Sequence, residues 1–250
     1  MTRIIMIGCN GKMGQVITDI VAADENAVIV AGVDITEAKN DYPVYGNISE
    51  VKEEADAIID FSSPKLLDAI LEYAVEKQIP SVLCTTGYSA QEIEKVNEAS
   101  KKVAILRSAN MSLGINTMIK VMETVTKTLA DAGFDIEIVE KHHNQKLDAP
   151  SGTALALADA INGELNNEYD YKYDRSTLRE KRPKKEIGIS AVRGGTIVGE
   201  HEIIFAGTDE VIEFKHTAYS KAIFGKGAVS AAKFLKGKAA GLYNMKHVIG

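Results

Sequence analysis

Short apolar runs alternate with helix-like stretches over the first 110 residues of the chain. The runs are rich in β-branched residues and have the length of buried strands, whereas the stretches between them repeat apolar residues at the spacing of an amphipathic helix. Ser63 with Pro64, and Ser89 with Glu92 at capping-box spacing, are expected helix starts. Strands are expected at residues 3–8, 27–34, 56–62, 80–87 and 103–110, and helices at 11–24, 65–78 and 89–102. This alternation predicts an α/β fold with a Rossmann-like, doubly wound parallel sheet.

The pattern changes after Asn110. A long helix is followed by a strand with Ile136 and Ile138 on one face, by a helix that begins at Ser151, by consecutive strands with glycine-containing turns, and by a last helix. The expected ranges are 114–133, 134–143, 151–162, 187–220 and 221–237. The sequence therefore predicts a dinucleotide-binding domain, residues 1–110 with 219–250, and an inserted α+β domain, residues 111–218.

Composition excludes several classes of protein. The 250 residues suffice for one or two domains, and the apolar share of 45% is that of a globular chain. The net charge of −6 argues against nucleic-acid partners and anionic membranes, and the basic run at residues 175–186 is interpreted as a solvated loop. No signal peptide or apolar run of membrane-spanning length is evident. Cys9 and Cys84 lack metal or redox spacing, which indicates a reduced, cytoplasmic protein.

Three glycines follow the first expected strand directly and lead into a helix. Gly8 allows a tight turn, Gly11 lets the backbone approach a pyrophosphate, and Gly14 permits close packing of helix on sheet. The helix start offers N–H groups and partial positive charge to phosphate. Asp34 ends the second strand, where a carboxylate can bind the ribose hydroxyls of a dinucleotide. A glycine turn without a cofactor is the alternative.

Asp34 also bears on the choice of cofactor, which is expected to be NADH or NADPH. A carboxylate accepts hydrogen bonds from the 2′-hydroxyl of NAD and repels the 2′-phosphate of NADP. No arginine follows Asp34, and Lys12 is the nearby cation that a phosphate could use. These residues favour NADH binding at least as strong as NADPH binding.

The segment EKHHNQKLDAPSGTA, residues 140–154, gathers groups suited to acid–base chemistry. Adjacent histidines on a strand point to opposite faces, so His142 and His143 are not expected to hold one metal ion, and no metal site is predicted. Ordinary strand-end histidines are the structural alternative. Lys146 and the helix start at residues 150–153 favour a catalytic interpretation instead, because cations and helix amides can hold an anion while histidine or lysine moves a proton. The set suits a small carboxylated substrate.

The same segment resembles the signature of the dihydrodipicolinate reductases, also called 4-hydroxy-tetrahydrodipicolinate reductases. It matches every specified position of the run Glu-x-His-His-x-x-Lys-x-Asp-x-Pro-Ser-Gly-Thr-Ala. The resemblance extends to GCNGKMG, CTTGYS, SANMSLGIN, AVRGGTIVGEHEIIFAG and HTAYSKAIFGKGAVSAAKFL, which is nearly the whole chain. Cys84, Met111 and Lys221 depart from the glycine, phenylalanine and arginine that are common in the family.

The resemblance implies a cytoplasmic homotetramer, joined through the sheet of the inserted domain, that reduces a cyclic dicarboxylate in the diaminopimelate route to lysine. His142 would be the acid/base residue and Lys146 the proton donor. His143 and the amides of Gly152 and Thr153 would bind the substrate carboxylates. The implied cofactor contacts are Gly8, Cys9, Asn10, Gly11, Lys12, Met13, Asp34, Cys84, Thr85, Thr86, Ser108, Ala109, Asn110 and Met111.

Two other functions remain open from the sequence. One is a different oxidoreductase on a related two-domain plan, such as a sugar or amino-acid dehydrogenase. Its usual strand-end motif is Glu-Lys-Pro, whereas this chain has Glu140, Lys141 and His142. The other is a non-catalytic NAD-binding regulator, which would have no reason to combine His142, Lys146 and an anion-binding helix.

Overall fold

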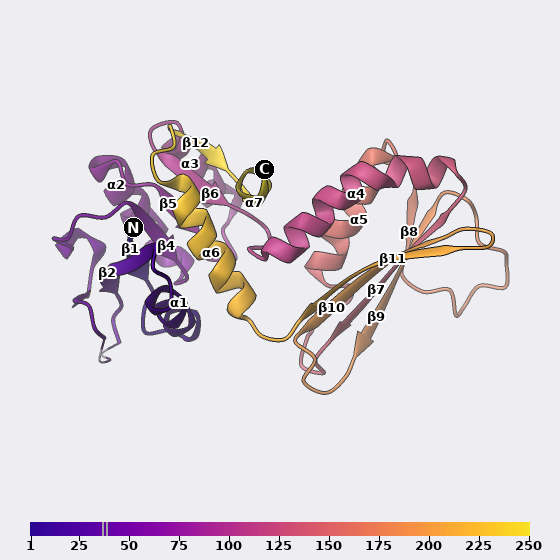
Figure 1. The fold of residues 1–250 in the computed structure, drawn as a ribbon, viewed down its shortest axis with the longest axis horizontal. Coiled ribbons are helices and arrows are strands. Elements are labelled where there is room, and N and C mark those ends of the chain that lie inside the picture. Colours follow the sequence, from indigo (N-terminus) through magenta and orange to yellow (C-terminus); the bar gives the residue numbers. More distant parts are fainter. Residues whose placement is uncertain (37, 39) are drawn as a thin grey trace. The chain divides into compact units, whose positions relative to one another are not determined.

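The computed structural model describes residues 1–36, 38 and 40–250 of the chain. These residues form two compact units, which we describe separately (Figure 1). Unit 1 comprises Met1–Leu113 and Ala222–Gly250, and unit 2 comprises Gly114–Lys221. The chain therefore passes from unit 1 into unit 2 once and returns once.

Unit 1 is built on a sheet of seven parallel strands in the order β12-β6-β5-β4-β1-β2-β3. The strands are β1 (Thr2–Ile7), β2 (Ala27–Val33), β3 (Val44–Tyr45), β4 (Ala57–Asp60), β5 (Ser81–Leu83), β6 (Ala104–Arg107) and β12 (Gly241–Tyr243). β1 lies between β2 and β4, so the strand order reverses there. This is a Rossmann-like, doubly wound sheet, and it confirms the fold class that the sequence predicted.

Successive residues of β1 are buried in two cores on opposite sides of this sheet, because helices cover both of its faces. The elements are α1 (Lys12–Ala22), α2 (Leu67–Lys77), α3 (Ala90–Ser100), α6 (Ala222–Leu235), α7 (Met245–Ile249) and the 3-10 helices η1 (Ile48–Glu50) and η2 (Pro64–Leu66). One core contains Ile17 of α1 and Ala228 of α6. The second core contains Leu67 of α2 and Val96 of α3.

Two helix starts obey the local signals in the sequence. The Ser89 hydroxyl accepts the N–H of Glu92 at 3.3 Å, and the Glu92 carboxylate accepts the N–H of Ser89 at 2.7 Å, which confirms the capping box of α3. Ser63 caps η2 with Pro64 in its first turn, so this segment begins as a 3-10 turn ahead of α2. The short elements β3, β8, β12 and α7 were not predicted, since two to five residues are too few to show a period.

Unit 2 is built on a mixed sheet in the order β11-β10-β7-β9-β8. Its strands are β7 (Asp135–His142), β8 (Asp170–Lys172), β9 (Glu186–Arg193), β10 (Gly199–Ala206) and β11 (Val211–Ala218). β10 runs antiparallel to both β7 and β11, whereas β9 runs parallel to β7 and β8. The predicted strand-rich region is therefore a single sheet with β7 at its centre.

One face of this sheet is covered by α4 (Leu113–Asp131) and α5 (Gly152–Glu164). The core between sheet and helices includes Ile136 and Ile138 of β7. Burial alternates along β7, so Glu140 and His142 continue the same inward face. The sheet thus carries two polar side chains into the end of an apolar core.

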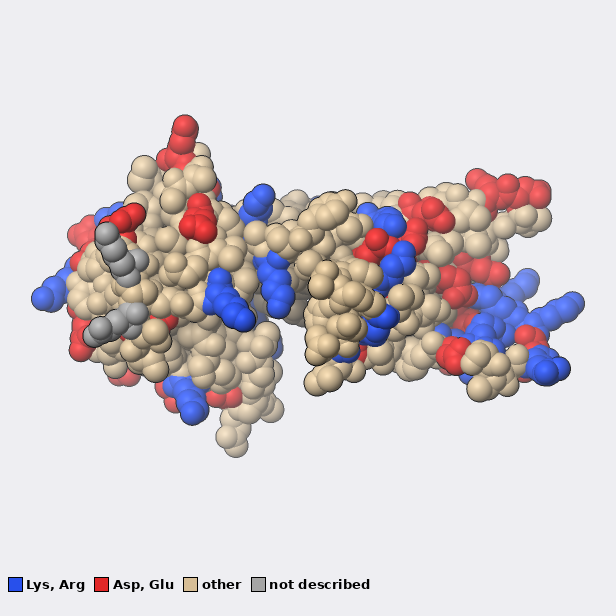
Figure 2. All heavy atoms as spheres, turned by 90° about the horizontal axis from the view of Figure 1, so that it is seen from below, with Lys and Arg blue, Asp and Glu red and all other residues tan. Residues whose placement is uncertain are grey.

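Charged side chains of both signs are interspersed on the face shown in Figure 2, without a broad basic surface. The basic run at residues 175–186 is a loop up to the start of β9, but two of its arginines fold back. Arg175 bonds to Glu186 at 2.6 Å, and Arg182 pairs with Asp135 and Glu137 at 2.8 and 2.9 Å. Within the described residues, no helix combines the length and the apolar character that crossing a bilayer requires.

Candidate active site

The carboxyl end of β7 places an acid–base pair inside unit 2. Glu140 is fully buried and His142 is 8% exposed. His142 Nδ1 lies 2.6 Å from Glu140 Oε2. Because Nδ1 is committed to the carboxylate, Nε2 is the ring nitrogen that remains for chemistry.

Glu140 is held as a carboxylate by three sets of donors. Arg193 donates to its two oxygens at 2.8 and 2.7 Å, and the backbone N–H of Ser151 donates at 2.9 Å. Burial alone would raise the pKa of Glu140, but the hydrogen bonds from Arg193, His142 and Ser151 hold that pKa below its ordinary value. An ionised carboxylate only accepts hydrogen bonds, so His142 Nδ1 donates and Nε2 presents a lone pair when the ring is neutral.

A glycine leaves space beside the reactive nitrogen. A Cβ built on Gly199, the first residue of β10, would lie 3.1 Å from His142 Nε2. A larger residue at this position would therefore crowd the imidazole at Nε2. The space depends on the pairing of β10 with β7, which cannot be read from the sequence.

The start of α5 lies beside this pair. Ser151 is the N-cap, and its hydroxyl accepts the N–H of Ala154 at 3.1 Å. Gly152 and Thr153 are therefore the first residues of the helix, where the dipole favours an anion. Since the N–H of Ser151 also bonds to Glu140, the helix start is joined to the acid–base pair.

A carboxylate of the chain itself lies at this helix start. Asp148 pairs with Lys146 Nζ at 2.8 Å and accepts a hydrogen bond from the backbone of Gly152, and both contacts lower its pKa, Lys146 more strongly. His143 follows β7 directly, and its carbonyl accepts the N–H of Lys146 at 3.2 Å. Lys146 and the start of α5 can thus hold one carboxylate together, as the sequence led us to expect for a substrate.

Two residues of this cluster were not predicted. Arg193 pairs in register with His142, and His201 pairs with Glu140. Each continues the apolar face of its strand, as Glu140 does on β7. Strand alternation could have placed them on the inward faces, but only the pairing of the strands brings them to Glu140 and His142.

His201 is a neutral, buried partner of the helix cap. It is 4% exposed, its Nε2 lies 3.1 Å from the Ser151 hydroxyl, and its ring meets the His142 ring edge-on at 5.1 Å. Burial, and then the neighbouring His142, lowers the pKa of His201 to about 4. His201 is therefore uncharged at neutral pH and does not compete with His142 for protons.

This burial predicts an acid-sensitive fold. The unfolded chain binds a proton at His201 near the reference pKa of about 6.5, whereas the folded chain keeps the ring neutral down to a pKa of about 4. The unfolded state binds more protons in this window, so stability falls as pH falls. We expect this residue to reduce the free energy of unfolding by about 2 kcal/mol between pH 7 and pH 5, measured by urea denaturation.

His201→Gln and His247→Gln form the matched pair for this measurement. Glutamine keeps a hydrogen-bonding side chain but does not titrate, so the pH dependence should shrink in His201→Gln. The exposed His247 of α7 should leave it unchanged. An identical pH dependence in His201→Gln and the parent chain would contradict the assignment.

In unit 1 the glycine loop has the geometry that its spacing predicts. Gly8 has a φ of 78°, and a Cβ on Gly14 would lie 2.2 Å from the Gly8 carbonyl oxygen, so no other residue fits at Gly14. Gly11 is the N-cap of α1, and Lys12 is its exposed first residue. The loop therefore leads directly from β1 into a helix start whose N-cap and first residue are exposed.

Asp34 follows β2 in a fixed orientation. Its two carboxylate oxygens accept the backbone N–H groups of Asn10 at 3.0 Å and Thr36 at 2.8 Å. A surface hollow beside it is lined by Asp34, Ile35, Thr36, Ala38, Val44, Tyr45 and Gly46. The glycine loop and the acidic strand end are thus joined by a hydrogen bond, and the strand end borders an open hollow.

The remaining predicted cofactor contacts lie at the same edge of the sheet. Cys84, Thr85 and Thr86 follow β5, and residues 108–111 follow β6. Because all strands of this sheet are parallel, their carboxyl ends share one edge with the glycine loop and Asp34. Burial raises the pKa of the Cys84 thiol well above its usual value and that of Cys9 to about 11, so neither is a thiolate at neutral pH.

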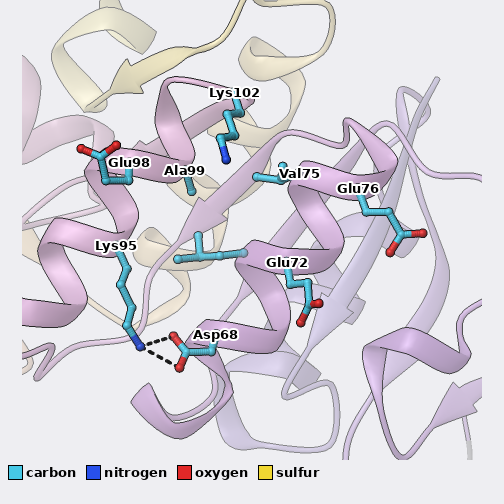
Figure 3. A pocket seen from close by; sticks show the side chains of 9 residues that line it. Asp68, Glu72, Val75, Glu76, Lys95, Glu98, Ala99 and Lys102 are labelled. Atoms are coloured by element: carbon cyan, nitrogen blue, oxygen red, sulfur yellow. Dashed lines mark hydrogen bonds and ion pairs between the residues drawn. The ribbon is translucent and has the colours of Figure 1, made fainter.

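A separate groove lies between α2 and α3 and contains none of the predicted site residues (Figure 3). Its lining side chains are Asp68, Leu71, Glu72, Val75, Glu76, Lys95, Glu98, Ala99 and Lys102. Lys95 is already paired with Asp68 at 2.7 Å. We therefore assign no ligand to this groove. Among residues 1–36, 38 and 40–250, no group of three or more His, Cys, Asp or Glu side chains is arranged to hold a metal ion.

Comparison with known proteins identifies both halves of the chain. The family model described as "Dihydrodipicolinate reductase, N-terminus" matches residues 2–111, and "Dihydrodipicolinate reductase, C-terminus" matches residues 114–249. The chain is 53% identical to the 4-hydroxy-tetrahydrodipicolinate reductase of Caldanaerobacter subterraneus subsp. tengcongensis over 249 residues, which is 100% of this chain and 98% of the relative. It is 50% identical to the protein of that name from Clostridium tetani, covering 98% of this chain and 96% of the relative.

Solved structures share the fold. The dipicolinate-bound dihydrodipicolinate reductase from Paenisporosarcina sp. TG-14 is 24% identical, covers 100% of both chains, and has a TM-score of 0.82. A myo-inositol dehydrogenase from Corynebacterium glutamicum is 15% identical, covers 99% of this chain and 92% of its own, and has a TM-score of 0.59. The two-unit plan is therefore shared with other dehydrogenases, whereas the sequence similarity is to the reductases.

Proposed function

The chain belongs to the dihydrodipicolinate reductase family, and on that premise we propose that it reduces 4-hydroxy-tetrahydrodipicolinate to tetrahydrodipicolinate with NADH or NADPH. The reaction belongs to the diaminopimelate route of lysine biosynthesis. The observation that carries the proposal is the buried Glu140–His142 pair joined to the start of α5, where Asp148 pairs with Lys146. A regulator that only binds NAD would have no use for this arrangement.

The nucleotide is assigned to unit 1 because the residues there fit it. Gly14 tolerates no side chain, Gly8 adopts a positive φ, and Asp34 is held with its carboxylate at the end of β2. A dinucleotide needs these features: close backbone approach for its pyrophosphate and an acceptor for its ribose hydroxyls. When bound, the nicotinamide supplies the hydride.

The dicarboxylate is assigned to unit 2. One carboxylate would replace Asp148 on Lys146 and on the amides of Gly152 and Thr153, with His143 as a further contact. His142 Nε2 would act as the acid/base group, and the Lys146 ammonium would donate a proton. Glu140 keeps the His142 ring oriented while the proton moves.

Units 1 and 2 support the domain division expected from the sequence, residues 1–110 with 219–250 for the nucleotide and 111–218 for the substrate. A cytoplasmic homotetramer would use the face of the unit 2 sheet opposite α4 and α5. Val139 and Ile204 lie there, only half-buried, opposite Glu202 and Glu137 in the register of β7 and β10. Apolar side chains on an outward sheet face favour association with another copy.

Dipicolinate provides the test of the substrate site. In an assay coupled to dihydrodipicolinate synthase, the protein should consume NADH or NADPH, and pyridine-2,6-dicarboxylate should inhibit competitively against the cyclic substrate. Crystals soaked with it should show one carboxylate at Gly152 and Thr153, with Asp148 displaced from Lys146. Density elsewhere, or no inhibition at millimolar concentration, would count against the assignment.

The cofactor preference follows from Asp34. Because its carboxylate is fixed by two backbone N–H groups, it accepts the 2′-hydroxyl of NADH and repels the 2′-phosphate of NADPH. We expect NADH to bind at least as tightly as NADPH in calorimetric titrations at fixed salt. Asp34→Asn should shift the ratio of the two affinities towards NADPH. A ten-fold preference of the parent chain for NADPH, about 1.4 kcal/mol, would refute the prediction.

A further inference from the structure

Asp60 is a buried carboxylate in unit 1 that the reaction described above does not use. It is the last residue of β4 and is 0% exposed. A charged group in such a place is costly unless hydrogen bonds satisfy it. The groups that bond to Asp60 therefore indicate which segments its carboxylate holds in place.

Among the described residues, the polar groups that contact the Asp60 carboxylate donate hydrogen bonds to it. The hydroxyl and the backbone N–H of Ser62 reach Oδ1 at 2.5 and 3.1 Å, and the Tyr88 hydroxyl donates to Oδ2 at 3.2 Å. The Thr85 side chain also bonds to Asp60, and its Oγ1 accepts the N–H of Ser62 at 3.0 Å. Burial raises the pKa of Asp60, and these donors oppose that shift. An acceptor with two oxygens is thus what this cluster requires.

The cluster ties together the segments that follow two neighbouring strands. Ser62 lies after β4, whereas Thr85 and Tyr88 lie between β5 and α3. The backbone of Cys84 also donates to the Asp60 carbonyl at 2.9 Å. On the other side, the Phe61 carbonyl lies against the glycine loop, since a Cβ on Gly8 would come within 2.7 Å of it. Asp60 therefore sets the position of the backbone beside Gly8.

The strand order indicates which half of a bound dinucleotide would lie next to this region. Asp34, at the end of β2, is the expected contact of the adenosine ribose. The glycine loop after β1 is the expected contact of the pyrophosphate. β4 and β5 lie on the other side of β1 from β2. A dinucleotide that crosses β1 from Asp34 must extend its second half over the ends of β4 and β5.

We propose that Asp60 is a positioning residue for the nicotinamide half of the cofactor, acting through Ser62 and Thr85. The inference rests on the proposed use of a nicotinamide nucleotide. Asp60 touches neither substrate nor cofactor in this role; it fixes the backbone that the nicotinamide riboside meets. The adenosine half depends on Asp34 and the glycine loop instead.

Comparing NADH with ADP separates the two halves. Asp60→Asn removes the charge and replaces one acceptor oxygen with an NH₂ donor, so the hydroxyl that faces it, Thr85 or Tyr88, must turn to accept and no longer holds its segment as before. We expect the Kd for NADH to rise about ten-fold, a loss comparable to one hydrogen bond to a charged group, while the Kd for ADP changes less than about two-fold. KM for NADH should rise with the Kd.

Asp56→Asn is the matched control, because Asp56 immediately precedes the same strand at its opposite end. It bonds to Arg3 and to Lys236, each at 3.1 Å. This variant should lower the Tm and leave the ratio of NADH to ADP affinity unchanged. If Asp60→Asn fails to fold, Ser62→Ala and Tyr88→Phe remove single donors and should still weaken NADH more than ADP.

Three results are distinguishable. Equal weakening of NADH and ADP, or no weakening of either, in Asp60→Asn or in both single-donor variants would overturn the role of Asp60. Selective weakening of NADH supports it. A parent protein that binds ADP but neither NADH nor NADPH would instead refute the proposed function.

Discussion

Replacing Lys146 with alanine is expected to lower kcat by about 10²–10⁴-fold, the usual contribution of a general acid, or roughly 3–5 kcal/mol of barrier. KM for the dicarboxylate should rise as well, because the ammonium also holds a carboxylate in the ground state, as it holds Asp148 in this structure. His142→Ala should lower kcat similarly. NADH affinity should stay nearly intact in both variants, since the nucleotide residues lie in unit 1. Steady-state kinetics and NADH titration measure these quantities.

Lys146→Arg separates charge from proton transfer. The guanidinium keeps the positive charge but does not release a proton near neutral pH, so KM should recover more than kcat. Asp148→Asn is the control for the ion pair: it frees Lys146 without removing the ammonium, so it should spare kcat. If Lys146→Ala and His142→Ala each kept more than about a tenth of the parent kcat, neither residue could be the general acid.

Glu140→Gln is expected to impair both stability and catalysis. The substitution leaves the Arg193 guanidinium without a full partner inside the protein, and breaking a buried ion pair in this way typically costs about 3–5 kcal/mol. An amide NH₂ facing His142 Nδ1 would reverse the tautomer, so Nε2 would carry the proton, and kcat should fall by about 10²-fold or more. Urea denaturation and steady-state kinetics report the two effects separately.

Glu137→Gln is the matched control for this experiment. Glu137 lies on the same strand but on the opposite face, where it pairs with Arg182 at 2.9 Å. Its ion pair is partly exposed, so the variant should cost about 1 kcal/mol or less and leave kcat unchanged. If Glu140→Gln kept the parent kcat, Glu140 would be a structural residue and not the group that orients His142.

Lowering the pH should destabilise the part of unit 2 that contains Glu140 and His201. The pKa of Glu140 is held down in the folded chain, so its contribution to stability is present above its unfolded pKa of about 4.3 and disappears as pH falls through the folded value. His201 acts at higher pH, in the window between about 6.5 and its folded pKa of about 4. Both groups make unfolding easier in acid, because each binds a proton more readily in the unfolded chain.

Local patterns in the sequence were enough to predict the fold class, and in one segment they indicated acid–base chemistry. The alternation of strands and helices, the capping box at Ser89 and the glycine loop depend on residues close together in the chain. A hydrophobic period or a helix cap can be recognised from neighbouring positions, because its buried face or its hydrogen bonds form within one element. The run of residues 140–154 likewise displayed its histidines, lysine and helix start side by side, and it carried the resemblance to the family.

Only the tertiary structure decided which distant groups complete the site. Arg193 reaches Glu140 from 53 residues away, His201 reaches Ser151 from 50 residues away, and Gly199 clears the space at His142 Nε2. These contacts depend on the register of β9 and β10 against β7, which is set by packing over the whole sheet. Asp60 follows the same logic: the sequence shows an aspartate at the end of a strand, and the parallel pairing of β4 with β5 supplies the donors that explain it.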